Sequence, residues 1–449
     1  MARRWWVGGV VAVAIFSGSA AAEAFTVFGQ PPFLSSGQVE SLPFTLFGEQ
    51  VTPRLDIDGF LRYQTIGQRL NGTTQGLMAP EVNLDVNLQL TAQQRVHMLL
   101  RPVDQGNGRP TVYQWPGNPG WTVRAEGEPA AIWYEGQPFN WLTPRDSFPL
   151  DVSVAGGRMP LFFHNGLWFD NIIDGFALAK LNLQVGNLSN LGVLYFLTRG
   201  QTQPTGASTP AERREARKNV TGLVGYADWY AYHIEASWAL SYGNPRGPFD
   251  DNIDRNFWGV SVTRTFGDAG VSLRLLGSTG NDSRGAGVMF VVETAKGFDG
   301  WRVYANGYVA SENWLPVSEQ GSRTSRLGIL FTQDRLLPFP QLNGFASDTL
   351  GGVVGVVLNA KGTITVTPEI GGVRDNSPQH NDQIGGAVQV SADLASLLMP
   401  GTTLEDTRRR GVLYGLQALL TLAAVGNRND GTGHGRTDYG ARLELIYKL

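Results

Sequence analysis

The sequence of 449 residues predicts an all-β fold, a transmembrane antiparallel up-and-down β-barrel. Three observations predict this fold: an export signal at the N-terminus, strand-like segments that alternate polar and apolar residues, and a composition with 57 Gly, 10% aromatic residues and no Cys. The mean hydropathy of -0.14 agrees with it, because lipid-facing and lumen-facing side chains cancel along each strand of a barrel.

The first element is an N-terminal segment with the three parts of a secretory signal peptide. Arg3 and Arg4 supply positive charge, residues 5–16 are apolar, and small residues up to Ala24 offer cleavage sites. A membrane anchor is the alternative, but about 12 apolar residues are few for a spanning helix. We therefore expect a signal peptide at 1–24, a lead-in segment at 25–52 and the barrel at 53–449.

From residue 53 onward, short segments alternate with the period of a β-strand, whose successive side chains point to opposite faces. Such segments number about nineteen, at 54–63, 81–90, 95–101, 130–136, 150–159, 172–184, 189–198, 218–227, 232–242, 256–266, 271–275, 285–294, 301–309, 324–332, 351–359, 363–373, 382–394, 410–424 and 439–449. Because bacterial single-chain barrels have an even number of strands, we expect about 18, with about 16 or 20 as alternatives.

The connections between these segments predict which way the barrel faces. Short turns face the periplasm in such barrels and long loops face outward. Short turns are expected at 91–94, 185–188, 227–229, 266–269 and 295–300, and long extracellular loops at 64–80, 103–128, 199–217 and 244–255. The alternation of short and long connections fails between 311 and 351, where either 338–347 hides a strand or one counted segment does not cross. Short helices are expected at 209–219, which begins with helix-start residues, and at 392–398.

The last eleven residues indicate that the sheet lies in lipid. One face carries Tyr439, Leu443, Leu445 and Tyr447, and the other carries Arg442, Glu444 and Lys448. Elsewhere, too, apolar faces end in Tyr or Trp, which suits the two lipid–water interfaces, whereas a soluble sandwich buries its aromatic side chains in a core. A sheet in lipid must pair all its backbone groups internally, so we expect it to be closed.

The balance of charge limits the kind of partner. A net charge of -3 argues against a nucleic-acid partner. Of the 36 basic residues five are Lys, so Arg supplies the remaining 31. The Arg guanidinium holds carboxylates in a planar fork, which suits the wall of a pore for anions, although GC-rich coding enriches Arg equally well.

Residues 157–175 carry a family resemblance. The spacing of Gly157, Arg158, Leu161, Gly166, Trp168, Asp170 and Ile173 resembles that in alginate-export-family outer-membrane barrels, and substrate-specific porins have looser versions. Members of the family form monomeric channels, some of which conduct an anionic polysaccharide through a cationic lumen. The resemblance implies that Arg158 projects into the lumen near a constriction, with Asp170 and Asp174 nearby. The alternative is that an Arg–carboxylate pair only fixes a folded-in loop.

No motif predicts catalysis, a metal site or a cofactor, so we do not expect an enzyme. The five His form no metal-spaced pair, and a hydrolase elbow of the Gly-x-Ser-x-Gly type is absent from the sequence. His380, near Asp375 and Asp382, is a candidate cation ligand, but a solvated loop explains this run equally well. A Ser–His pair that meets across strands would escape motif analysis.

The alternation and the resemblance together predict a charged lumen. The expected pore-lining residues are Arg54, Asp56, Asp58, Arg62, Glu81, Asp85, Arg158, Asp170, Asp174, Glu235, Arg274, Arg302, Arg442 and Glu444. We expect a channel of the bacterial outer membrane for passive, substrate-biased diffusion of small polar or anionic solutes. The alternatives are a polysaccharide (alginate-like) exporter and a structural or adhesive barrel with a loop-closed lumen. The expected partners are the lipid bilayer, lipopolysaccharide and, during biogenesis, the barrel assembly machinery.

Overall fold

The structure is a computed structural model, and its chain divides into two units, Met1–Glu40 and Ser41–Leu449. It describes residues 44–46, 49–51, 53–91, 94–105, 109–116, 119–125, 127–141, 152–202, 218–242, 254–280, 285–317, 327–332, 337–343, 348–360, 362–377, 381–394, 397, 416–428 and 435–449. The expected signal peptide at 1–24 lies outside the described residues. So do residues 209–217 of one expected helix, residues 395, 396 and 398 of the other, and both His380 and His434.

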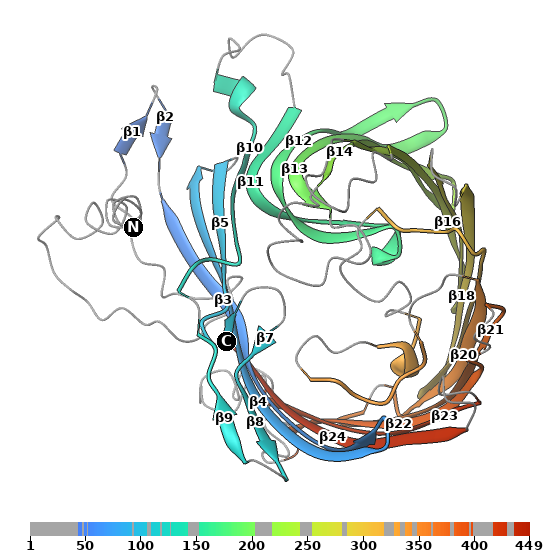
Figure 1. Ribbon diagram of the computed structural model, residues 1–449. Coiled ribbons are helices and arrows are strands. Elements are labelled where there is room, and N and C mark those ends of the chain that lie inside the picture. Colours follow the sequence, from blue (N-terminus) through green and yellow to red (C-terminus); the bar gives the residue numbers. More distant parts are fainter. Residues whose placement is uncertain are drawn as a thin grey trace, which may run out of the picture. The chain divides into compact units, whose positions relative to one another are not determined.

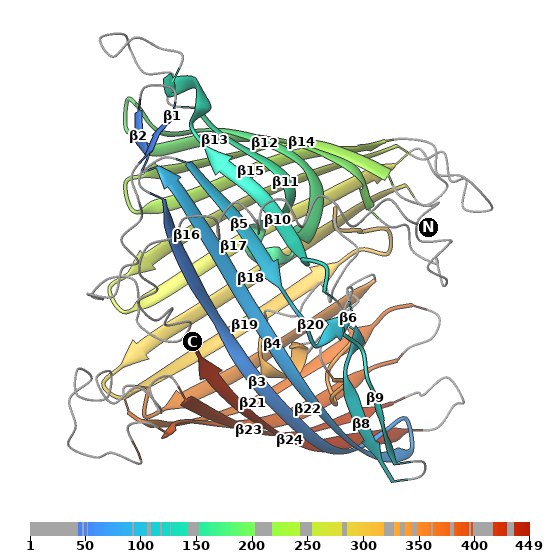
Figure 2. The ribbon, with the colours of Figure 1, turned by 90° about the vertical axis from the view of Figure 1, so that its left-hand side faces the viewer.

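The described strands of the second unit close into one antiparallel barrel of 18 strands (Figures 1 and 2), as the sequence predicts. Its strands in order are β3 (Arg54–Leu70), β4 (Thr73–Thr91), β5 (Gln94–Leu100), β10 (Ala131–Gly136), β11 (Val152–Phe163), β12 (Phe169–Val185), β13 (Leu188–Thr202), β14 (Lys218–Trp229), β15 (Tyr232–Tyr242), β16 (Arg255–Phe266), β17 (Ala269–Gly280), β18 (Ala286–Phe298), β19 (Trp301–Ala310), β20 (Thr349–Leu358), β21 (Ile364–Asp375), β22 (Gln383–Asp393), β23 (Leu416–Asn427) and β24 (Arg436–Lys448). The ring closes where β24 pairs with β3, from Tyr439 opposite Arg69 to Lys448 opposite Phe60.

The remaining elements lie in the lead-in segment and in the connections. They are the hairpin β1 (Phe44–Leu46) and β2 (Glu49–Val51), the short strands β6 (Asp104–Gln105), β7 (Arg109–Pro110), β8 (Val112–Trp115) and β9 (Gly120–Thr122), and the 3-10 turns η1 (Pro138–Trp141), η2 (His164–Gly166) and η3 (Ile329–Phe331). Among the described residues, no helix is long and apolar enough to cross a bilayer.

Alternate residues of the barrel strands expose large apolar side chains, which defines the outward face. Examples are Leu61, Tyr63, Trp238, Val260, Leu273, Leu275, Phe290, Val309, Val354, Ile370, Ile384, Leu420, Leu443 and Leu445. The residues between them contact connections that fold inside, as Ser237, Ser261 and Glu369 do. The wall therefore has an apolar outward face and an inner face that carries most of the polar residues, as period-two alternation requires.

The first hairpin differs from the expectation, because residues 64–80 are not a long loop. Strands β3 and β4 continue through this range and are joined by Asn71 and Gly72, whose φ angles are 53° and 78°. Positive φ at both central residues is the signature of a type I′ turn, for which Asn-Gly is the preferred sequence. The Asn-Gly pair thus predicts a tight hairpin where we expected a loop.

The surplus segment in the strand count is 324–332, which does not cross the barrel. Its described residues 327–332 contain η3, where Leu330 and Phe331 are buried. They belong to the connection between β19 and β20, which folds toward the interior (Figure 1). An apolar run of this length reads equally well as a strand or as a buried loop segment.

One end of the barrel carries most of the short turns. The connections β12–β13, β14–β15, β16–β17 and β18–β19 leave only residues 186–187, 230–231, 267–268 and 299–300 between strands. We call this the short-turn end. The exceptions on it are the β10–β11 and β22–β23 connections, at 137–151 and 394–415, which are longer.

Candidate functional site

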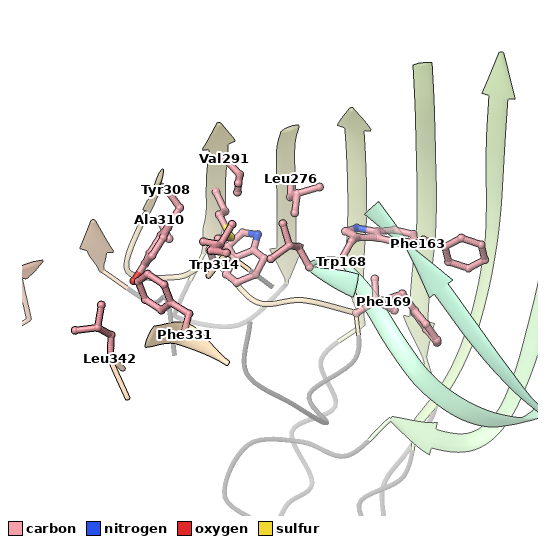
Figure 3. Packing of buried hydrophobic residues seen from close by; sticks show 14 of the residues in the cluster. Phe163, Trp168, Phe169, Leu276, Val291, Tyr308, Ala310, Trp314, Phe331 and Leu342 are labelled. Atoms are coloured by element: carbon pink, nitrogen blue, oxygen red, sulfur yellow. The ribbon is translucent and has the colours of Figure 1, made fainter. Parts of the chain in front are cut away.

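Two connections fold against the inner face of the wall and form the candidate site. The first inward loop, residues 164–168, joins β11 to β12, and the second inward loop joins β19 to β20, with 311–317, 327–332, 337–343 and 348 described. Figure 3 shows their large apolar side chains, among them Trp168, Trp314 and Phe331, in one continuous row along the wall strands. Apolar side chains of the loops are thus buried inside the barrel, where the strands would otherwise face water.

His164 anchors the first inward loop. Its Nδ1 lies 2.6 Å from Ser261 Oγ and its Nε2 lies 2.7 Å from Ser237 Oγ, so both ring nitrogens have partners on β16 and β15. Its backbone N–H donates to Glu235 Oε1 at 2.9 Å. Gly259 makes room for the ring, because a Cβ at that position would lie 2.7 Å from His164 Nε2. The imidazole is therefore held by neighbours on both sides.

The charge state of His164 follows from its burial. The residue is only 1% exposed, and this burial lowers the pKa of the imidazole to about 3, with a smaller contribution from the Arg274 guanidinium. The imidazole is accordingly neutral at physiological pH. One ring nitrogen then donates to a Ser hydroxyl while the other accepts, so two hydroxyls satisfy it fully.

The next residue of the first inward loop reaches a partly buried ion pair. Asn165 Nδ2 donates to Glu293 Oε1 at 2.9 Å. The other oxygen of Glu293 pairs with Arg274, whose Nη1 also donates to Ser272 Oγ at 2.7 Å. Arg274 and Glu293 thus serve as a platform under the loop, on β17 and β18.

Glu369 on β21 anchors the second inward loop. Its carboxylate accepts hydrogen bonds from the backbone N–H groups of Leu330 and Ile329, at 2.6 and 2.9 Å, and from the Tyr304 hydroxyl at 2.5 Å. Leu342 then donates its N–H to the Leu330 carbonyl at 2.8 Å and ties the rest of the loop to η3. A buried carboxylate with three donors is a strong attachment.

The two inward loops also contact each other. Val317 donates its backbone N–H to the carbonyl oxygen of Trp168 at 2.9 Å. Trp168 and Trp314 are both completely buried. The backbone of Trp314 approaches β18 so closely that a Cβ on Gly287 would lie 2.0 Å from its nitrogen. Together the loops form one layer over the inner faces of β15 to β22.

A chain of alternating charges crosses the seam where the barrel closes. Arg62 on β3 pairs with Glu81 on β4 at 2.7 Å and with Glu444 on β24 at 3.2 Å. Arg442 pairs with Glu444 at 2.9 Å and lies 4.8 Å from the ring centroid of Phe339 in the second inward loop. The four charged residues alternate in sign, so each charge has an opposite neighbour at the inner face.

The other expected charges of the inner face lie nearer the short-turn end. Arg54 pairs with Asp56 at 2.8 Å, and Asp58 lies directly opposite Asp85 in the strand register. Arg302 is on the inner face of β19, as the second residue of the strand. This region is richer in carboxylates than the seam.

The expectation for Arg158, Asp170 and Asp174 is wrong, because these residues lie on the outward face. Arg158 is opposite Asp174 and Ile132 in the register, and Ile132 is 47% exposed on the outside. Asp170 is opposite the exposed Phe162. The physical reason is that the inner face of β11 and β12 is taken by apolar side chains that pack under the first inward loop.

The sequence analysis missed the residues that hold the loops. His164, Asn165, Glu293 and Glu369 belong to different connections and strands, and only the closed barrel brings them to their partners. In segment 285–294 Glu293 shares its face with Gly287, Met289 and Val291, so alternation gave no signal for it. No spacing rule joins His164 to Ser237 and Ser261, which follow it by 73 and 97 residues.

The Ser–His–Glu arrangement around His164 does not form a catalytic site. The imidazole and both hydroxyls are buried, so a substrate has no access to the nucleophile. Within the described part of the chain, no group of three His, Asp or Glu side chains is placed to hold a metal ion. Structural anchoring accounts for every contact of this cluster.

Comparisons with known proteins show a shared fold. No protein-family model matches the sequence, and no curated protein does either. Among solved structures, Acinetobacter baumannii OccAB3 matches with a TM-score of 0.55 and 10% identity, over 88% of this chain and 99% of that one. Pseudomonas aeruginosa OccK2 (OpdF) and a BenF-like porin from Pseudomonas fluorescens Pf-5 each match with a TM-score of 0.54 and 13% identity, over 88% of this chain and 98% of theirs.

These matches bear on the family resemblance of residues 157–175. They agree with a porin-like barrel and give no support to the alginate-export family. Arg158, which carried that resemblance, lies on the outward face. The chain thus has the closed 18-stranded fold found in porins, at a sequence identity that shows the fold alone.

Proposed function

We propose that the protein is a bacterial outer-membrane channel for passive, substrate-biased diffusion of small polar or anionic solutes. The observation that carries the proposal is the closed barrel, whose outward face is apolar and whose inner face carries ion-paired charges. Such a wall pairs its backbone in lipid and leaves polar groups inside. An N-terminal signal peptide at 1–24 and partners in lipopolysaccharide and the barrel assembly machinery belong to the same proposal.

The inner face supports a mixed-charge filter. Arg62 and Arg442 alternate with Glu81 and Glu444. Arg62 and Glu81 are partly exposed, whereas Arg442 and Glu444 are buried, so a passing solute meets the first pair and the field of the second. Opposed charges in a narrow passage favour hydrated polar solutes and limit the preference for anions. One structural neighbour, Pseudomonas aeruginosa OccK2, has been solved with glucuronate, at a TM-score of 0.53. We therefore propose small sugar acids as the first solutes to test.

Conductance and uptake measurements test the channel. The purified protein is inserted into planar bilayers, and uptake of glucuronate and of neutral glucose is compared in proteoliposomes. We expect stable single-channel steps, a modest preference for anions and uptake of glucuronate. A folded protein that neither conducts ions nor admits either solute would exclude the proposal.

The Arg62→Met variant tests the filter. Removing this cation leaves Glu81 and Glu444 unbalanced, so the reversal potential in a salt gradient is expected to shift toward cations. A unit charge about 10 Å from the ion contributes about 0.4 kcal/mol in water, or a factor of about two in permeability. Arg158→Met is the matched control, because Arg158 lies on the outward face. Equal shifts in both variants would contradict the assignment of Arg62 to the pore.

A barrel closed by its loops is the second candidate, and one observation favours it. The bond between Val317 and Trp168 joins the two inward loops, which would plug the lumen if no passage remained beside them. This structural or adhesive barrel predicts no conductance in the same experiment. The third reading, export of an alginate-like polysaccharide, rests on residues 157–175 alone and predicts uptake of long anionic chains as well as monomers.

A further inference from the structure

Arg264 and Lys296 differ from the cations of the inner face. Both lie on the outward face, Arg264 opposite Tyr232 and Lys296 opposite Val303. Among the described residues, neither has a carboxylate within an ion-pair distance, whereas Arg62, Arg274 and Arg442 all do. Two outward cations without a counter-charge from the described residues can attract an anion from outside the protein.

Aromatic rings hold both cations in place. The guanidinium of Arg264 lies 4.5 Å from the centroid of Tyr232 and 4.4 Å from that of Phe266, and it donates a hydrogen bond to the Tyr232 hydroxyl. The ammonium of Lys296 lies 5.2 Å from the centroid of Phe298. That ring in turn stacks on Trp301 at 4.0 Å. Cation–π contacts of this kind orient a charge without neutralising it.

The position of the two cations places them at a membrane interface. Phe266 ends β16 and Phe298 ends β18, so both cations lie within two residues of the turns at the short-turn end. Exposed aromatic side chains surround them, with Phe266 exposed by 51% and Trp301 by 39%. A belt of exposed aromatic side chains marks the lipid–water boundary of a barrel. A cation at that boundary costs far less free energy than one at the midplane of the bilayer.

The strand register places the two cations on either side of one strand. Arg264 is opposite Val271 of β17, and Lys296 is opposite Ala269 of the same strand. The cations therefore flank β17, whose small outward side chains Ala269 and Val271 form the floor between them. Two strand spacings, about 10 Å, separate β16 from β18. The Arg264 guanidinium lies toward Tyr232 on β15, and the Lys296 ammonium lies over Phe298 of its own strand, so each cation occupies its own place along the same stretch of the interface.

We propose that Arg264 and Lys296 bind the phosphates of anionic phospholipid headgroups, with the acyl chains against the apolar wall of β15 to β18. The proposal rests on the proposed outer-membrane location. Short turns face the periplasm in such barrels, so the lipid belongs to the phospholipid leaflet and not to lipopolysaccharide on the other side. Basic residues at a membrane surface attract anionic lipids by about fivefold per cation.

Native mass spectrometry of the full-length protein tests the site. The protein takes up lipid from vesicles of equal parts phosphatidylglycerol and phosphatidylethanolamine at 0.15 M salt. The lipids that stay bound to the protein in the mass spectrometer are then counted. We expect wild type to retain phosphatidylglycerol preferentially, and the R264Q/K296Q variant to lose this preference by about fivefold or more. Arg374→Gln is the matched control, since Arg374 is an exposed outward cation at the opposite end of the barrel. Unchanged retention in the double variant, or an equal loss in the control, would overturn the proposal.

Three further measurements decide the cases that the double variant leaves open. If the double variant does not fold, the single Lys296→Gln variant decides, with an expected loss of about fivefold. Displacement of bound phosphatidylglycerol by lipopolysaccharide would overturn the assignment to the phospholipid leaflet. Conductance measured on the same samples separates the lipid-site proposal from the channel proposal. A variant with wild-type conductance and no lipid preference supports the lipid site. A protein that retains the lipid but does not conduct contradicts only the channel.

Discussion

At the scale of single residues, the inner wall is shaped by glycines that admit the inward loops. Gly259 leaves space for the His164 ring, and Gly287 leaves space for the backbone of Trp314. These positions carry no polar group and bind no solute. They nevertheless decide where the loops lie, because any side chain there would meet atoms of the loop at less than van der Waals distance.

Replacing Gly259 by Ala is expected to displace the first inward loop. The added Cβ would lie 2.7 Å from His164 Nε2 and 2.9 Å from Ser237 Oγ, and overpacking of this kind costs about 1–3 kcal/mol. We expect larger and noisier single-channel currents, because the released loop no longer holds its place in the lumen. Gly225→Ala is the control, since its nearest atoms are 3.9 Å away. Identical currents from the two variants would show that the loop does not limit conduction.

Single residues also explain why the sequence analysis put Arg158 on the wrong face of the barrel. The rule that charges face the lumen holds at Arg62, Glu235 and Glu444, whose outward neighbours are apolar. It fails on β11, where Met159, Leu161 and Phe163 face inward and are buried. An inward loop turns the adjacent wall into a packed core, which reverses the polarity that alternation alone predicts.

At the scale of elements, strands were predictable and the loops inside the barrel were not. The period of two in 81–90 and 439–449 depends only on local geometry, so it located the second half of β4 and most of β24, although it missed the first part of β4. The segment 324–332 has the same apolar character, but its partners lie on strands far away in the sequence. Glu369, which also accepts a hydrogen bond from the Tyr304 hydroxyl, binds η3 only after the barrel has closed, so no local pattern distinguishes this segment from a strand.

Docking of the first inward loop is expected to depend on pH through His164. Burial lowers the pKa of the docked imidazole to about 3, while a released imidazole titrates near 6.5. The released state thus binds more protons, and docking is fully stable above about pH 6.5 and weakens as the pH falls. Between pH 6.5 and 5 the loss is about 2 kcal/mol, at 1.36 kcal/mol for each pH unit.

Single-channel recordings at pH 7 and pH 5 measure this effect. We expect acid to increase open-channel noise or conductance in wild type, whereas His164→Asn, which does not titrate, responds less. Glu235 on β15 and Arg274 on β17 face the imidazole in both proteins, so their own response to pH is common to the comparison. The same acid response in both proteins would assign it to these or other groups instead.

At the scale of the whole molecule, the fold depends on a pattern and not on particular residues. The chain shares 10–13% of its residues with barrels that it matches over 88% of its length. What they must share is a closed ring of antiparallel strands with apolar residues outward, because lipid offers no hydrogen bonds to an open sheet edge. The seam between β24 and β3 meets this need with a continuous register and with the ion pair between Arg62 and Glu444.

The outward face of β24 gives a direct test of this whole-molecule argument. Leu443 lies near the middle of the strand, is 41% exposed and is flanked by Arg442 and Glu444 on the inner face. Leu443→Arg places a second guanidinium beside Arg442 but in hydrocarbon, which is expected to lower the free energy of unfolding by about 2–4 kcal/mol. Leu443→Met conserves volume and polarity, so it should cost less than about 1.5 kcal/mol. Denaturant titrations of protein folded into phospholipid vesicles measure both values, and equal stability of the two variants would mean that this face does not contact lipid.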